Sequence, residues 1–254
     1  MSRLSNSAGK ERIDRRSRAP RGGQCAIAGL FSDGVCSAVA ALDTTRDQTS
    51  PAARRRVREA QSAAGRAVAK RLLAQLGEPD GEVGSAGDGS PIWPNGCRGS
   101  ISHSDTLVFV AVARADGLES LGIDVEPIFA SDIFGETAPV LFDADEMSLI
   151  EGARDPLCAA TIFFAAKEAL YKCLYPMTGT FFEFREAAVL SLDLTSGRVE
   201  IELRTMLSGR FRPGRIFAGT FAVERGSVFT AFEYRRPRHR VPRRGSAAVP
   251  APAR

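Results

Sequence analysis

The sequence predicts an α+β protein, and three observations support this class. A long helical pattern covers residues 51–76, two short apolar segments follow at 106–113 and 121–126, and four strand-like segments come after a second helical pattern. Helices and strands therefore occur in blocks, which is typical of α+β folds. The chain has 254 residues, of which 44% are hydrophobic and 25% charged, so it can bury a large core.

Charge is distributed unevenly along the chain. Residues 1–24 contain seven basic and two acidic residues, and residues 235–254 contain seven arginines and no acid. Both tails have few core-forming residues, so we expect them to be disordered. A basic tail either is simply solvated, which is the commoner case, or contacts nucleic acid or an acidic protein. The body between the tails is acidic, because the whole chain has a net charge of only +4, and we expect no nucleic-acid partner.

The cysteines and the apolar segments indicate a cytoplasmic protein. The five cysteines are odd in number and include no C-x-x-C pair, which favours reduced thiols over a disulfide framework or a zinc site. No apolar run has the length of a membrane span, and the N-terminus has no apolar signal segment. We expect no membrane association.

The first clear element is a helix from Pro51 to Leu76. Proline favours the first helical position, and Gly77 follows as a stop signal. Its cationic side chains lie away from the apolar stripe: Arg55, Arg58, Arg66 and Lys70. They form either a solvated face or a phosphate-binding face.

A polar loop over residues 77–90 leads into a segment that contains the only tryptophan, Trp93. A Pro-Asn-Gly turn then starts a short strand that ends with Ser102, His103 and Ser104. A single histidine usually has a structural role. Three adjacent polar donors that follow glycines, however, also suit a phosphate.

Two carboxylates lie at the end of a predicted buried strand. Leu121, Ile123 and Val125 alternate with Gly122, Asp124 and Glu126 up to Pro127, so the second set shares one face. Two adjacent carboxylates resist desolvation unless a cation lies between them, and a hard divalent cation takes oxygen ligands. The alternative is a solvated strand end.

The second helix is predicted over residues 161–175, ended by Pro176. One stripe of this helix is apolar, and Phe164, Glu168 and Lys172 form another at a spacing of four residues. Taken alone, Glu168 and Lys172 would be an ordinary surface salt bridge.

The remaining chain predicts an antiparallel meander of four strands: 187–194, 198–204, 216–224 and 228–234. We therefore divide the body into two α+β halves, residues 25–126 and 127–234.

Four motifs in order resemble the 4'-phosphopantetheinyl transferases of the Sfp/EntD type. They are the basic helix, W-P-N-G-x-x-G-S-I-S-H, L-G-I-D-V-E-P and F-F-A-A-K-E-A-L-Y-K. The second motif points to the EntD-like branch, which includes the mycobacterial enzyme. The resemblance covers about residues 50 to 230 and implies a monomer of two pseudo-symmetric halves, with the active site in the cleft between them.

The resemblance also implies a reaction. The enzyme would move 4'-phosphopantetheine from coenzyme A onto a serine of an apo acyl- or peptidyl-carrier protein and release adenosine 3',5'-bisphosphate, with Mg²⁺ or Mn²⁺. Carrier proteins of fatty-acid, polyketide, non-ribosomal peptide and siderophore pathways all remain possible partners. The alternatives are a Mg²⁺-dependent hydrolase of the coenzyme A pyrophosphate and a non-catalytic coenzyme A-binding module.

Matching motif positions imply the site residues. Asp124, Glu126 and Glu168 would bind the metal, and Glu168 would also accept the serine proton, while Lys172 would stabilise the leaving group. The residues implied to bind coenzyme A are Arg58, Arg66, Ser102, His103 and Lys167. One departure stands out, because members of this branch often have Lys or Arg shortly before the Trp-Pro pair, where this chain has residues 87–90 without a cation.

Overall fold

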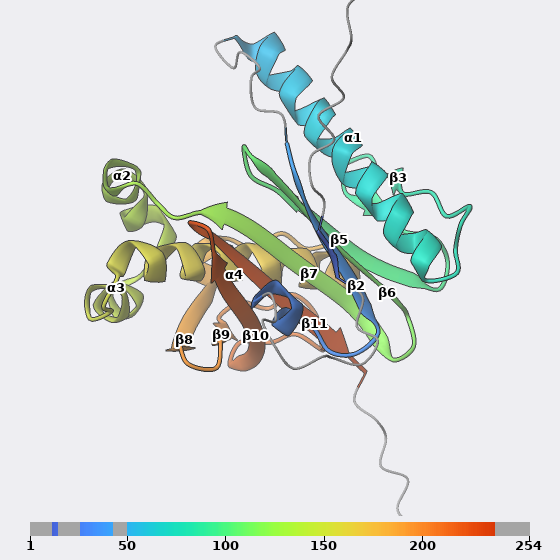
Figure 1. Cartoon of the computed structure of the whole chain (residues 1–254). Helices are drawn as coiled ribbons and strands as arrows, with labels where there is room; N and C mark the ends of the chain where they lie inside the picture. Colours follow the sequence, from blue (N-terminus) through green and yellow to red (C-terminus); the bar gives the residue numbers. More distant parts are fainter. Residues whose placement is uncertain (1–11, 15–25, 43–49, 237–254) are drawn as a thin grey trace, which may run out of the picture.

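The structure is a computed structural model that describes residues 12–14, 26–42 and 50–236 (Figure 1). The predicted α+β class is confirmed, with helices packed on antiparallel sheets. Almost all of the two basic tails lies outside the described residues, so their predicted disorder stays a prediction.

The N-terminal sheet has four antiparallel strands in the order β1-β2-β6-β5. Their bounds are Arg12–Asp14 for β1, Val35–Ala41 for β2, Cys97–His103 for β5 and Leu107–Arg114 for β6. The 3-10 helix η1, Ala26–Leu30, precedes β2, and a small hairpin pairs β3, Gly84–Ser85, with β4, Pro91–Ile92. The helix α1, Pro51–Gln75, begins at the predicted residue, ends one residue before the predicted Leu76, and packs on β6, β2 and β5.

The C-terminal sheet has five antiparallel strands in the order β7-β11-β10-β9-β8. Their bounds are Leu118–Pro127 for β7, Ala187–Asp193 for β8, Arg198–Leu203 for β9, Arg215–Glu224 for β10 and Ser227–Arg235 for β11. The predicted four-strand meander is confirmed. The helices are α2, Ser131–Leu141, α3, Ala144–Glu151, α4, Pro156–Thr178, and the short η2, Phe184–Glu186.

The buried residues form layers that follow the two-residue period of the strands. On β6, Val108, Val110 and Val112 pack under α1, whereas Phe109 and Ala111 pack toward β7. This explains why β6 is apolar throughout. A separate core fills the space between α4 and the C-terminal sheet.

The predicted boundary between the two halves is wrong by one strand. Residues 25–126 were expected to include β7, but β7 pairs with β11 along nearly its whole length, from Pro127 opposite Ser227 to Leu118 opposite Arg235. The strand therefore belongs to the C-terminal sheet. It also approaches β5, where the Ile123 amide donates a hydrogen bond to Ser100 Oγ at 3.2 Å.

The helix α4 is longer than the predicted 161–175. It begins at Pro156, with Asp155 accepting a hydrogen bond from the Cys158 amide as the N-cap. Pro176 does not end it, because a proline in the last turn removes only one donor. The helix ends two residues later, where Gly179 adopts a left-handed conformation with φ of 62°.

Gly122 allows α4 to lie unusually close to β7. A Cβ atom at this position would overlap the carbonyl oxygen of Ala169 and the amide nitrogen of Cys173, both backbone atoms of α4. Only glycine therefore permits this helix–strand distance. Since Asp124 is two residues along the same face of β7, Gly122 also sets how near Asp124 lies to α4.

We expect Gly122→Ala to lower the free energy of unfolding by about 1–3 kcal/mol, because the added methyl group must push α4 away from β7. Urea denaturation measures this loss. Gly135→Ala in α2 is the matched control, since a Cβ there meets no atom within 4 Å, and alanine in a helix should be neutral or stabilising. Equal stability of both variants would contradict the close-packing argument.

Candidate active site

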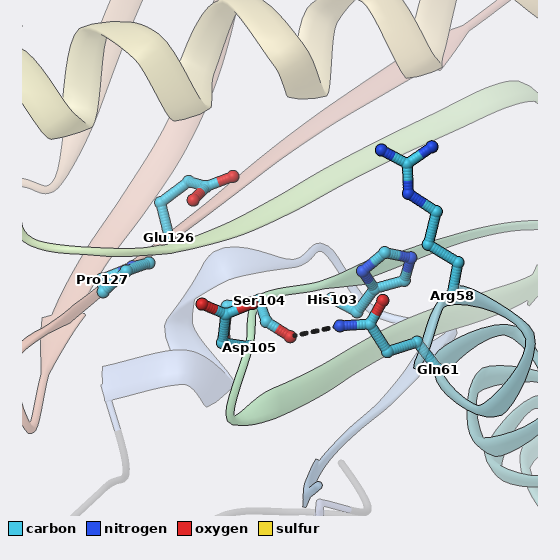
Figure 2. A pocket seen from close by; sticks show the side chains of 7 residues that line it. All are labelled: Arg58, Gln61, His103, Ser104, Asp105, Glu126 and Pro127. Atoms are coloured by element: carbon cyan, nitrogen blue, oxygen red, sulfur yellow. Dashed lines mark hydrogen bonds between the residues drawn. The ribbon is translucent and has the colours of Figure 1, made fainter. Parts of the chain in front are cut away.

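A cavity of about 540 Å³ opens between α1, the β5–β6 turn and the end of β7. Figure 2 shows its lining side chains, with Arg58, Gln61 and His103 on one side and Glu126 on the other. The lining residues are Arg58, Gln61, His103, Ser104, Asp105, Glu126 and Pro127. The cavity thus joins cationic and polar groups of the N-terminal half to a carboxylate of β7.

Asp124 lies next to this cavity and is almost completely buried, with 1% of its surface exposed. Its Oδ1 atom accepts a hydrogen bond from Ser102 Oγ at 2.6 Å and another from Lys172 Nζ at 2.5 Å. Its Oδ2 atom is also buried but has no hydrogen-bond partner among the described residues. A buried carboxylate oxygen without a partner is costly, so this atom is a candidate ligand for a cation.

Glu168 and Lys172 follow one another by one turn of α4, as the sequence predicted. Lys172 Nζ lies 4.0 Å from Glu168 Oε2, and both side chains are about one-third exposed or less, at 28% and 30%. They are not a solvated surface pair. Burial alone would lower the pKa of Lys172, but attraction from Asp124, Glu168 and Glu126 outweighs it and raises the pKa above its usual value.

The three carboxylates repel one another. Burial, followed by the charges of Asp124 and Glu168, raises the pKa of Glu126 to about 8. Burial raises the pKa of Glu168 as well, and Asp124 adds to this effect. A divalent cation would be favourable here, because it would offset the negative charges that raise the pKa values of Glu126 and Glu168.

The three side chains are near each other but are not gathered as metal ligands. Within the described ranges, no cluster of three or more His, Cys, Asp or Glu side chains has a metal-binding arrangement. Lys172 lies between Asp124 and Glu168 instead. The partnerless oxygen of Asp124 and the mutual repulsion of the carboxylates nevertheless fit a hard divalent ion.

Two of the predicted coenzyme A-binding residues line the cavity. His103, at the end of β5, and Arg58, on α1, face the same space (Figure 2). Burial lowers the pKa of His103, and the nearby charges of Lys172 and Arg58 lower it further. The Arg58 guanidinium and the His103 ring can both donate hydrogen bonds to an anionic ligand in this cavity.

Arg66 and Ser102 do not line this cavity. Arg66 lies two turns beyond Arg58 and donates hydrogen bonds to the hydroxyls of Ser62 and Ser85, so its role with coenzyme A stays a prediction. Ser102 is buried and its hydroxyl binds Asp124 Oδ1. Ser102 thus orients the Asp124 carboxylate, and its predicted contact with coenzyme A stays a prediction.

The prediction that Lys167 contacts a coenzyme A phosphate is wrong in this structure. The side chain is buried, and its ammonium group donates to Glu146 Oε2 at 2.8 Å and to the carbonyl oxygens of Leu141 and Phe184 at 3.0 Å each. All three ammonium protons are thus used within the C-terminal half. Glu146 in turn accepts hydrogen bonds from the amides of Asp143 and Val189.

Sequence reasoning missed Gln61, Glu146 and Asp88. Gln61 Nε2 donates to the Ser104 carbonyl at 3.3 Å and thereby fixes the turn beside His103 (Figure 2). Asp143 and Glu146 form a capping box at the start of α3, but nothing in the sequence pairs Glu146 with Lys167.

In the segment before the Trp-Pro pair, where this chain has no cation, Asp88 contacts α4. Its Oδ2 atom accepts a hydrogen bond from the Tyr175 hydroxyl at 2.6 Å, which ties the loop of residues 77–90 to the last turns of α4. Hydrogen bonds from Tyr175 and Ser90 lower the pKa of Asp88 to about 2. Trp93 has a packing role, since its ring covers Gly99 and contacts the core under α1.

Two family models match the chain in succession. The model described as the 4'-phosphopantetheinyl transferase N-terminal domain matches residues 46–113, and the model described as the 4'-phosphopantetheinyl transferase superfamily matches residues 120–222. The two matches meet at the turn between β6 and β7. This agrees with the sheet pairing, which assigns β7 to the C-terminal half.

Curated relatives are similar over most of the body. The 4'-phosphopantetheinyl transferase Npt of Nocardia iowensis is 32% identical over 178 residues, covering 66% of this chain and 79% of the relative. The 4'-phosphopantetheinyl transferase PptT of Mycobacterium tuberculosis is 31% identical over 172 residues, covering 65% and 74%. Enterobactin synthase component D of Salmonella typhimurium is 35% identical over 142 residues, covering 55% and 58%. Within the described part of the chain, no helix meets the length and hydrophobicity of a membrane span.

Proposed function

Because the chain belongs to the 4'-phosphopantetheinyl transferases, we propose that it transfers 4'-phosphopantetheine from coenzyme A to a serine of an apo carrier protein. The products are the holo carrier protein and adenosine 3',5'-bisphosphate, and the reaction needs Mg²⁺. The observation that carries this proposal is the buried Asp124, whose Oδ2 atom has no partner in the described residues. It lies beside a cavity lined by Arg58, His103 and Glu126.

We propose that Asp124, Glu126 and Glu168 hold the metal ion. Burial, together with the charges of neighbouring carboxylates, raises the pKa values of Glu126 and Glu168, which supports this assignment. When bound, Mg²⁺ would supply positive charge to neutralise the pyrophosphate of coenzyme A. Ser102 keeps the Asp124 carboxylate oriented through its bond to Oδ1.

In the transfer step, Glu168 accepts one proton and Lys172 stabilises one leaving group. The carrier serine Oγ forms a bond to the phosphorus that bears pantetheine, and the P–O bond to adenosine 3',5'-bisphosphate breaks. The serine proton passes to Glu168, which lies one turn of α4 from Lys172. Lys172, one turn along α4, stabilises the negative charge that develops on the leaving phosphate.

His103 and Arg58 would bind the nucleotide end of coenzyme A, because both line the cavity beside Glu126. We expect His103→Ala to raise the KM for coenzyme A about tenfold, as loss of one hydrogen bond to a charged phosphate costs about 1.5–3 kcal/mol, and to leave kcat within about threefold. Steady-state kinetics with coenzyme A as the varied substrate measure this. A rise in the carrier-protein KM instead would assign His103 to carrier docking.

The function is tested by the intact mass of an apo carrier protein after incubation with this protein, coenzyme A and Mg²⁺. We expect a gain of one phosphopantetheine on the carrier serine, and no gain when EDTA is present. Consumption of coenzyme A without any carrier gain, across several carriers, would support the alternative of a pyrophosphate hydrolase. Comparing several carriers also addresses which pathway the protein serves.

A further inference from the structure

We propose that Lys172 is the resident counter-ion of Asp124 before the metal binds, and that a divalent cation must displace its ammonium group from Asp124. This inference rests on the proposed function, because it assumes that Asp124 is a metal ligand. It gives Lys172 two successive positions, first on Asp124 and then beside the leaving phosphate.

The geometry shows an ammonium group inside the carboxylate cluster. Lys172 Nζ lies 2.5 Å from Asp124 Oδ1, 3.1 Å from Ser102 Oγ and 4.0 Å from Glu168 Oε2. Asp124 has only 2% of its side chain exposed, so this ammonium is its principal source of positive charge. A buried carboxylate without a cation would be strongly destabilising.

An ammonium group and a divalent cation compete for this position. Both would approach the same carboxylate within a few ångströms of one another, where two positive charges repel strongly in a partly buried site. The Oδ1 atom is shared between Lys172 and Ser102, whereas Oδ2 has no partner in the described chain. A cation that binds Oδ2 would therefore lie within a few ångströms of the ammonium on Oδ1, and this repulsion would drive the ammonium away from Asp124.

Two features of the site allow Lys172 to leave. The Lys172 side chain is 28% exposed, so its flexible stem has access to open space, unlike the fully buried Lys167. Ser102 Oγ also donates to Asp124 Oδ1, so the carboxylate keeps one hydrogen bond after the ammonium departs. Lys172 is then available to the phosphate side of the site.

The test is the affinity of the coenzyme A-free protein for Mn²⁺, measured by electron paramagnetic resonance of the free ion. We expect Lys172→Gln to bind Mn²⁺ at least about tenfold more tightly than the unmodified protein, because the competing charge is gone. Glutamine keeps a hydrogen-bond donor for Asp124 and so protects the fold. Arg58→Gln removes a cation from the wall of the same cavity and should change the affinity less than about threefold, because the effect of a charge falls with distance.

The outcomes distinguish a failure of the displacement proposal from a failure of the proposed metal site at Asp124. If Lys172→Gln binds no more tightly than the unmodified protein, or if Arg58→Gln tightens binding equally, the displacement proposal is wrong. If neither protein binds Mn²⁺ without coenzyme A, it is wrong as well. If Asp124→Asn binds Mn²⁺ as well as the unmodified protein, the metal assignment in the proposed function fails instead.

Thermal unfolding in EDTA and in Mg²⁺ gives a second readout that does not depend on catalysis. We expect Lys172→Gln to have a lower Tm than the unmodified protein in EDTA, since Asp124 has lost its counter-ion. Mg²⁺ should then raise the Tm of the variant more than that of the unmodified protein, because tighter binding stabilises the folded state more. An equal Mg²⁺ shift in both proteins would overturn the proposal.

Discussion

Asp124→Asn should lower the rate of phosphopantetheine transfer by a factor on the order of 10³, with the fold retained. A metal bound at a reacting phosphate stabilises the transition state by several kcal/mol, and each 1.36 kcal/mol corresponds to about a tenfold change in rate. Asparagine keeps an oxygen that can accept the hydrogen bonds of Ser102 and Lys172 but loses the charge needed for the cation. Holo carrier protein formed per minute, followed by mass spectrometry, measures the loss.

The control for this substitution is Asp116→Asn. Asp116 is exposed in the turn that leads into the same strand, so the substitution removes an equal charge away from the cavity, and we expect transfer within about twofold of the unmodified protein. Melting curves of both variants establish that they are folded. Activity of Asp124→Asn above about one tenth of normal at saturating Mg²⁺ would refute its role as a ligand.

Lys167→Met should lower the free energy of unfolding by about 3–5 kcal/mol, a larger loss of stability than we expect from Gly122→Ala. The reason is that it removes one partner of a fully buried ion pair and leaves the Glu146 carboxylate without its cation. It also leaves the carbonyl oxygens of Leu141 and Phe184 without the ammonium that joins α2 and η2 to α4. Urea denaturation measures the effect.

Two further variants distinguish the loss of the buried Lys167–Glu146 ion pair from the loss of a surface charge. Lys70→Met removes the lysine of an exposed pair with Glu82 and should cost about 0–1 kcal/mol. The double variant Lys167→Met/Glu146→Gln should recover part of the loss, because the charge is removed while the side-chain oxygen still serves the Val189 amide. A small stability loss together with a higher KM for coenzyme A would restore the original assignment of Lys167 to coenzyme A.

The sequence predicted the local parts of this site well. Alternation along β7 correctly placed Asp124 and Glu126 on the face opposite Ile123 and Val125, because strand periodicity depends only on neighbouring residues. The four-residue spacing of Glu168 and Lys172 likewise brought both to one face of α4. These patterns hold in the folded structure because they depend only on residues that are close in the sequence.

The errors concern contacts between distant segments. Lys167 and Glu168 are adjacent in a recognised motif, but only the packing of α3 and η2 decides that Lys167 faces inward. In the same way, β7 was assigned to the wrong half because its partner β11 lies about a hundred residues later. The segment that forms β2 was not recognised either, since its small residues show no clear period.

The pairing of β7 with β11 also has a consequence for folding during synthesis. The strand that carries Asp124 and Glu126 has its ladder partner at residues 227–235, so the carboxylates reach their final positions only after nearly all of the described chain has left the ribosome. Until then β7 is an unpaired apolar edge, which is a hazard for aggregation. A nascent chain that stops before β11 would therefore carry every proposed active-site residue in its sequence and still be inactive.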